Sequence, residues 1–239
     1  MTAKTVTRAA IALLFLFITA CAAHQPDPGF KPVDLSADAR TGKIVRKADN
    51  FMIIMDASQS MAEPDVFKGV TRFNRAWDIV ARINATLPNV GFMAALRSAS
   101  GPFNFNQSVS KLYYGPTRYD RQLYKEAMEH AILSKGKTPL ADSINLAAKD
   151  LSYAKGTVSV LILSDGGNNV GDPVLATKKM KAAYGDRLCI NVIQIGENVA
   201  GKKLLSSIVE HGGCGELSAE ADLATADGVA DFVKKVFFE

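Results

Sequence analysis

The sequence predicts an α/β fold, a doubly wound and mostly parallel sheet with helices on both faces. Short apolar runs rich in β-branched residues recur between positions 51 and 195, and such runs are typical of strands buried on both faces. The segments between them place apolar side chains three and four positions apart, which is the helical pattern. Strands that alternate with helices in this way are typical of βαβ units, and these build parallel sheets.

The expected elements follow one another within a single domain of residues 48–239. We expect strands at Phe51–Met55, Val90–Leu96, Ser108–Tyr114, Val158–Leu163 and Cys189–Ile195, and one that starts over Gly213–Leu217. We expect helices at Arg72–Leu87, Asp120–Leu133, Leu140–Leu151, Val174–Tyr184, Lys202–His211 and Ala226–Phe237. Hydrophobic residues make up 48% of the chain and charged residues 22%, so the composition suffices for a buried core.

The amino terminus predicts export. Lys4 and Arg8 precede an apolar run, Ala9–Ala20, which is too short for a membrane-spanning helix of about 20 residues. Residues 1–20 are therefore predicted to be a signal peptide. Its removal lowers the net charge from +4 to +2, and no basic run with interleaved aromatic residues follows, so nucleic acid is not an expected partner.

The end of this segment, Ile18-Thr19-Ala20-Cys21, resembles the lipobox of bacterial lipoproteins. The resemblance implies that Cys21 becomes the lipidated first residue and anchors the protein to a membrane of the bacterial cell envelope. Ala22 favours the outer membrane, and the alternative is an ordinary signal peptide with an incidental cysteine. Residues 21–47 contain several prolines and no sustained period, so a flexible tether is expected there.

Oxygen-bearing side chains follow the first strand. Asp56, Ser58 and Ser60 form a DxSxS pattern directly after Phe51–Met55. Open α/β sheets bind their ligands outside the carboxyl ends of the strands. Carboxylate and hydroxyl oxygens suit Mg²⁺, with Mn²⁺ or Ca²⁺ as alternatives; Ca²⁺ is less favoured because an EF-hand loop would need Glu where Phe67 stands.

Two further segments would reach the same sheet edge. Gly136–Leu140 opens a helix, and Ser164–Gly167 follows the strand Val158–Leu163. Taken together, FMIIMDASQSM, GKTPLADSI and LILSDGG resemble the three loops of the metal ion-dependent adhesion site (MIDAS) of von Willebrand factor A (VWA) domains. The similarity extends over residues 49–237 and implies the VWA fold.

The resemblance also implies roles for individual residues. Ser58 and Ser60 would bind the metal directly, Asp56 and Asp165 would lie beside it, partly through water, and Thr138 would bind it in the ligand-competent arrangement. A carboxylate of the partner would complete the coordination. Because few protein ligands are charged, the cation would remain open to an external anion.

Each of these residues also has a purely structural explanation. Asp56 and Ser58 could cap the following helix, Thr138 could cap the helix from Leu140, and Asp165 could start a turn with two glycines. Asp142, in the first helical turn, could hydrogen-bond the loops without contacting the metal. It could instead only interact favourably with the helix dipole.

Once Cys21 is assigned to lipid, Cys189 and Cys214 remain in a compartment that permits oxidation. They lie at the starts of two strands expected to be neighbours, whose spacing suits a disulfide. We therefore predict a disulfide at the sheet edge opposite the metal loops. The alternative is a buried, unpaired Cys189.

No nucleophile elbow or Cys-His pair occurs, and the three histidines lie in the tether, in an amphipathic helix and at a helix end. We therefore expect a non-enzymatic adhesion or scaffold module that binds a protein or other acidic ligand through the metal. One alternative is a phosphohydrolase of the haloacid dehalogenase type, but Ser58 stands where that family needs a second Asp. The other is a structural envelope lipoprotein without metal. The partner and the oligomeric state are open.

Overall fold

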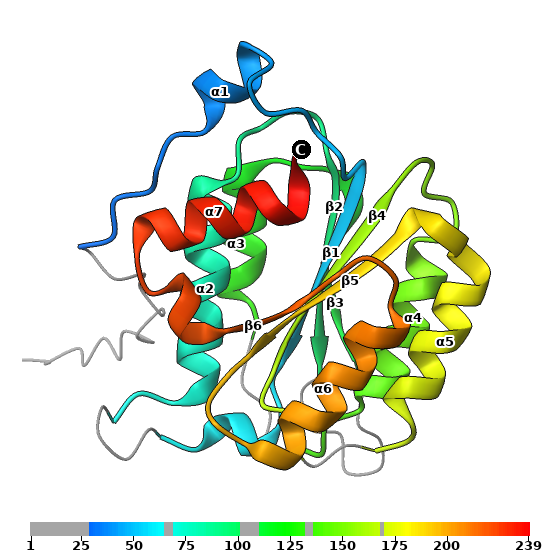
Figure 1. Cartoon of the computed structure of the whole chain (residues 1–239). Helices are drawn as coiled ribbons and strands as arrows, with labels where there is room; N and C mark the ends of the chain where they lie inside the picture. The colour runs from blue at the N-terminus through cyan, green and yellow to red at the C-terminus, as the bar shows by residue number, and fades with distance from the viewer. Residues whose placement is uncertain (1–28, 65–68, 101–109, 132–135, 168–169) are drawn as a thin grey trace, which may run out of the picture.

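The computed structural model describes residues 29–64, 69–100, 110–131, 136–167 and 170–239. A six-stranded sheet in the order β3-β2-β1-β4-β5-β6 runs through the molecule (Figure 1). All neighbouring strands pair in parallel except β2 and β3, which are antiparallel. The strands are β1 (Asn50–Asp56), β2 (Met93–Ala99), β3 (Leu112–Arg118), β4 (Val158–Ser164), β5 (Leu188–Gln194) and β6 (Leu217–Ala219).

Helices cover both faces of this sheet, which confirms the predicted doubly wound α/β class. Helices α2, α3 and α7 pack on one face, and α4, α5 and α6 pack on the other (Figure 1). The α-helices are α1 (Ser36–Arg40), α2 (Arg72–Thr86), α3 (Arg121–Glu129), α4 (Leu140–Asp150), α5 (Pro173–Tyr184), α6 (Val199–His211) and α7 (Ala226–Phe237). Three short 3₁₀ helices are η1 (Gln59–Ala62), η2 (Gly185–Arg187) and η3 (Glu220–Leu223).

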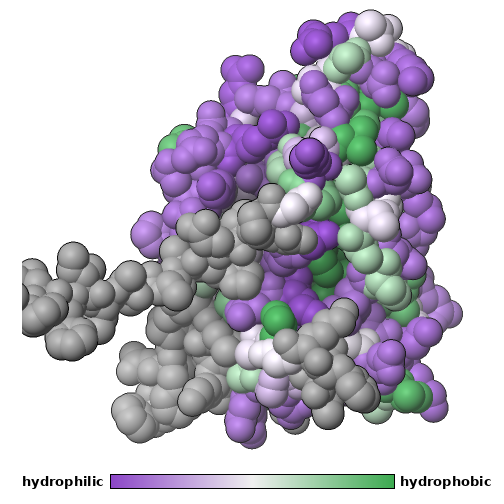
Figure 2. Space-filling view, turned by 90° about the vertical axis from the view of Figure 1, so that its left-hand side faces the viewer, coloured by the Kyte–Doolittle hydropathy of each residue, from purple (hydrophilic) through white to green (hydrophobic). Residues whose placement is uncertain are grey.

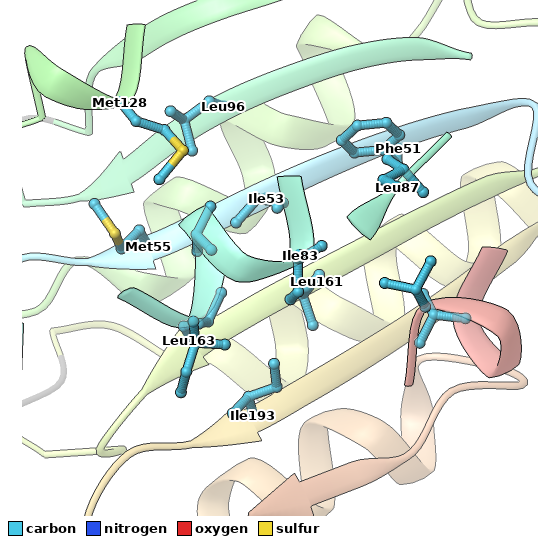
Figure 3. Close-up of a cluster of buried hydrophobic side chains, with 14 of the residues drawn as sticks. Phe51, Ile53, Met55, Ile83, Leu87, Leu96, Met128, Leu161, Leu163 and Ile193 are labelled. Atoms are coloured by element: carbon cyan, nitrogen blue, oxygen red, sulfur yellow. The ribbon is translucent and has the colours of Figure 1, made fainter. Parts of the chain in front are cut away.

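Strand β1 explains why its apolar run is continuous. Successive side chains of a strand point to opposite faces. Phe51, Ile53 and Met55 enter the core under α2, α3 and α7, which Figure 3 shows, while Met52 and Ile54 enter the core under α4, α5 and α6. Every residue of β1 is buried, so the central strand holds the two layers together and ends in a buried Asp56.

The expected flexible tether is wrong for residues 29–47, which pack on the domain as a segment that we call the N-terminal strap. Leu35 is 1% exposed, and Phe30, Val33 and Ile44 pack against the core. The backbones of Val45 and Glu239 exchange two hydrogen bonds, of 2.8 and 2.9 Å, so the strap lies beside the end of α7 (Figure 1). Proline-rich composition did not reveal these contacts, because isolated apolar residues and backbone pairing carry little periodic signal.

The disulfide predicted between Cys189 and Cys214 is present, with Cα atoms 4.7 Å apart. Cys189 lies at the start of β5, and Cys214 lies in the turn between α6 and β6. The bond therefore lies at the amino ends of the parallel strands, on the side of the sheet opposite the carboxyl end of β1. Strand β6 itself begins only at Leu217, at the end of the range in which we expected it to start.

Other element bounds differ modestly. Strand β3 begins four residues later than expected and runs to Arg118, because this edge strand is partly exposed and lacks a continuous apolar signal.

Cys21 and the predicted signal peptide lie outside the described residues. No helix within the described ranges combines the length and apolar character needed to cross a bilayer. The side on the left of Figure 1 is mostly hydrophilic, with apolar residues gathered in a narrow strip (Figure 2).

Candidate metal centre

The first loop of the site follows β1. Met55 pairs with Leu163 of β4, so the next residues, Asp56 and Ser164, emerge together at the carboxyl edge of the sheet. The Asp56 carboxylate accepts a hydrogen bond from the Ser58 backbone N–H (2.9 Å) and one from the Ser164 hydroxyl (2.5 Å). Both serines are completely buried. Register and local turn geometry thus fix Asp56 between the two strands.

The third loop follows β4 and contacts the first through side chains. The Ser60 hydroxyl donates to Asp165 Oδ1 at 3.0 Å and lies 3.2 Å from the Ser58 hydroxyl oxygen. Asp165 is 1% exposed, and its Oδ1 also accepts from the Gly167 backbone N–H at 2.8 Å. Four of the five predicted ligands therefore form one connected, buried cluster.

Thr138 connects the second loop to the third. Its hydroxyl donates to the Gly167 carbonyl at 2.8 Å, and the Val170 N–H donates to the Thr138 carbonyl at 2.9 Å. The first and second loops are joined by the Gln59 N–H and the Gly136 carbonyl, 2.9 Å apart. Each pair of loops is thus hydrogen-bonded, and the three predicted segments meet in one place.

The structure also tests whether these residues serve as helix caps or turn residues. Helices α2, α3, α5, α6 and α7 each have a side-chain N-cap, whereas α4 begins after Pro139 without one, because Thr138 is directed to the third loop. Ser58 precedes η1 but makes no side-chain cap. Asp165 does form the turn with Gly167. The hydroxyls of Ser58 and Thr138 therefore have no capping role.

Glycines allow the loops to approach one another. A Cβ on Gly167 would lie 3.3 Å from the Ser60 hydroxyl oxygen and 3.1 Å from Asp165 Oδ1, so a side chain would crowd the oxygens. Gly166 adopts φ +72°, where its Cβ would meet Gly201 of α6 at 2.5 Å. The Gly-Gly pair thus keeps the cluster open while its loop packs on α6.

Electrostatics mark Asp56 as the unusual carboxylate. Burial raises its pKa from 3.8 to about 6, and the neighbouring Asp165 acts in the same direction, against the hydrogen bonds from Ser164 and Ser58. In the part of the chain that the structure describes, no cationic side chain is bonded to Asp56. A charge buried without a cation is costly, and a bound cation would relieve that cost.

The donor set fits a small divalent cation. Ligands on adjacent vertices of a magnesium octahedron lie about 3 Å apart, and the hydroxyl oxygens of Ser58 and Ser60 are 3.2 Å apart. Three hydroxyls and two carboxylates are hard oxygen donors, as Mg²⁺ or Mn²⁺ prefers. Across the described ranges, no cluster of three or more His, Cys, Asp or Glu side chains offers an alternative metal site.

The remaining predicted residue, Asp142, lies in the first turn of α4 with an exposed side chain. Its position favours the helix-dipole interpretation.

Sequence analysis did not assign two residues that contact the cluster. Ser164 donates to Asp56, and Arg72 donates to Asp165 Oδ2 at 3.3 Å. Ser164 stands within the SDGG segment, but no sequence pattern indicates Arg72, which is 93 positions away from its partner.

Comparisons with known proteins place the fold. No protein-family model matches the chain, and no curated protein matches it in sequence. Among solved structures, it is similar to an aerotolerance-related membrane protein from Bacteroides fragilis (19% identity, 78% of this chain and 96% of that chain, TM-score 0.56). It is also similar to a von Willebrand factor type A structure from Catenulispora acidiphila (19%, 80% and 43%, TM-score 0.55).

A third similar structure is described as containing a metal. It is proximal thread matrix protein 1 from the mussel byssus, with a zinc-occupied MIDAS motif (15% identity, 81% of this chain and 47% of that chain, TM-score 0.56). At these identities the likeness concerns architecture. Together with the strand order and the three converging loops, it shows that this chain has the von Willebrand factor A fold.

Proposed function

We propose that this protein is a non-enzymatic VWA binding module that holds a divalent cation in its three loops and presents it to an acidic group of a protein partner. The observation that carries the proposal is the buried cluster of Asp56, Ser58, Ser60 and Asp165, to which the Thr138 hydroxyl is joined through the Gly167 carbonyl. Because the direct protein ligands would be uncharged hydroxyls, with Asp56 and Asp165 beside the ion and partly separated from it by water, a bound Mg²⁺ or Mn²⁺ would stay electrophilic toward a carboxylate of the partner.

The residues themselves explain why binding is favoured over catalysis. Ser58 and Ser60 would ligate the cation, while Asp56 and Asp165 would accept hydrogen bonds from its waters. His130, at the end of α3, and His211, at the end of α6, are not part of the three loops. Ser58 has no acidic proton to give a leaving group, which also argues against a phosphohydrolase of the haloacid dehalogenase type.

The first test is thermal melting of the metal-free protein with added Mg²⁺ or Mn²⁺. The protein is produced without residues 1–21, which keeps every described residue. We expect each ion to raise the melting temperature in a saturable way, because a ligand that binds only the folded state stabilises it. Thr138→Ser should retain the shift, whereas Thr138→Val, of the same shape but without the hydroxyl, should reduce it.

No shift with either ion, in the wild type as in Thr138→Val, would favour the metal-free structural lipoprotein instead.

The second test is pulldown from bacterial envelope extracts in Mg²⁺ and in EDTA, with Asp165→Asn as the matched control. We expect a partner recovered only by the wild type in Mg²⁺. Equal recovery by both proteins would remove the loops from the binding mechanism.

We also propose that lipid on Cys21 anchors the module in the cell envelope, with the outer membrane as the favoured destination. The lipobox-like sequence supports this, and so does the description of the similar Bacteroides fragilis structure as a membrane protein. Mass spectrometry of the membrane-extracted protein should find acyl groups on Cys21. Recovery of unmodified protein that starts elsewhere would contradict the anchor.

A further inference from the structure

Arg72, the first residue of α2, contacts the candidate metal centre. Its Nη1 donates to Asp165 Oδ2 at 3.3 Å, to the Ser60 carbonyl at 3.0 Å and to Glu63 Oε2 at 2.7 Å. The Arg72 side chain is 25% exposed and the Asp165 side chain 2% exposed. A full positive charge thus lies against a buried carboxylate of the site.

The position of Arg72 is defined by surrounding structure. Gly196, two residues after the end of β5, adopts φ +74°, and a Cβ there would lie 2.9 Å from Arg72 Nε. The Gly196 N–H donates to Glu220 Oε1 at 3.2 Å, and Glu220 Oε2 accepts from Arg75 Nε at 2.9 Å. This loop is therefore held in place, and the absence of a side chain at position 196 leaves room for Arg72.

Asp165 would serve the guanidinium and a cation at once. Its Oδ1 already accepts from the Ser60 hydroxyl and the Gly167 N–H, and its Oδ2 accepts from Arg72. A divalent ion bound beside Asp165 would compete with Arg72 for the same negative charge, and the two cations would repel each other. The other acid bonded to Arg72, Glu63, is 64% exposed and screens this repulsion weakly.

We propose that Arg72 is an internal counter-charge that neutralises Asp165 in the absence of metal and thereby lowers the affinity of the site for divalent cations. The inference rests on the proposed metal-binding function and concerns how that site is tuned. Arg72 stabilises the metal-free protein and opposes metal binding. These two effects have opposite signs, which a merely structural arginine would not produce.

The test compares wild type, Arg72→Gln and Arg72→Lys in two measurements. Isothermal titration with Mn²⁺ alone gives the affinity, and thermal melting in EDTA gives the stability of the metal-free state. Without the charge, Asp165 keeps its contacts to Ser60 and Gly167, so we expect Arg72→Gln to bind Mn²⁺ about tenfold tighter yet melt at a lower temperature in EDTA. Arg72→Lys keeps the charge and should stay within about threefold of wild-type affinity.

Raised ionic strength should narrow the difference in Mn²⁺ affinity between Arg72→Gln and wild type, because the Arg72 charge is partly exposed and salt screens it. If the glutamine variant does not fold, Arg72→Met, which keeps the apolar stem, makes the same comparison. Equal or weaker Mn²⁺ binding by the uncharged variant, with binding intact in the wild type, would overturn the role of Arg72 alone. If no variant and no wild-type protein binds Mn²⁺, the metal site itself fails, and this inference fails with it.

Discussion

The two edges of the sheet, at the carboxyl and at the amino ends of its parallel strands, are held together by different kinds of contact. At the carboxyl edge, buried Asp56, Ser58, Ser60 and Asp165 contact one another through polar atoms. At the amino edge, the aromatic rings of Phe51, Phe92, Tyr119 and Phe237 pack edge to face, the strap pairs with Glu239, and a disulfide joins β5 to the turn before β6.

This difference separates stability from function within one domain. Edge-to-face rings, apolar burial and a covalent link stabilise the fold whatever is bound. A buried carboxylate without a bonded cation destabilises it until a cation arrives. Substitutions at the amino edge should therefore change stability but not metal binding, whereas substitutions at the carboxyl edge should change metal binding.

The largest effect is expected from the disulfide. Cys189→Ser/Cys214→Ser removes a link between residues 25 positions apart, which should lower the free energy of unfolding by about 3 to 4 kcal/mol. Urea denaturation measures this. The rise in melting temperature on adding Mn²⁺ should persist in the variant, and its loss would break the proposed separation of the two edges.

The strap should come next. Leu35→Ala removes a buried side chain at the margin of the core, where neighbours can relax, so we expect a loss of about 2 kcal/mol or somewhat more. Leu123→Ala is the matched control, because Leu123 is 56% exposed and should change stability little. Equal denaturation midpoints for both variants would show that residues 29–47 do not contribute to the fold.

Asp56 should give the smallest change in stability, with the opposite sign. Asn can accept from the Ser58 N–H and donate to the Ser164 hydroxyl oxygen, so Asp56→Asn removes the buried charge and reverses the direction of the bond to Ser164. In EDTA at pH 7 we expect the variant to be more stable than wild type by about 1 to 2 kcal/mol and to show no melting shift with Mn²⁺.

The pH dependence follows from the raised pKa. Asp56 takes up a proton near pH 6 when folded but only near pH 3.8 when unfolded, so the folded state binds more protons between these values. Metal-free wild type should gain stability from this group as the pH falls from about 7 to about 4. Asp56→Asn should lack that gain, and parallel stability curves in EDTA would contradict the assignment.

How far the sequence predicted this structure depends on the kind of contact. Strands β1, β4 and β5 lie within one or two residues of their predicted bounds, because central strands are apolar on both faces and leave a continuous run. Edge strand β3 was displaced because partial exposure breaks its pattern. The three loops were found because their residues are local motifs, two of which follow strands and one of which opens a helix.

The strap and Arg72 were missed for a related reason. Val45 meets Glu239 through the backbone, which has no side-chain signature, and Leu35 is flanked by Asp34 and Ser36, so no continuous apolar run marks it. Arg72 reaches Asp165 only after the chain has folded, and the same arginine on an exposed helix would look identical in sequence. Long-range contacts of single side chains were thus beyond the reach of pattern analysis.

The central claim, that three loops form a cation site, is tested most directly by diffraction from crystals grown with Mn²⁺. We expect an anomalous peak in contact with the Ser58 and Ser60 hydroxyl oxygens and near Thr138, and no such peak in crystals of Asp56→Asn. Well-ordered loops without a peak in the wild type, or manganese bound elsewhere, would contradict it.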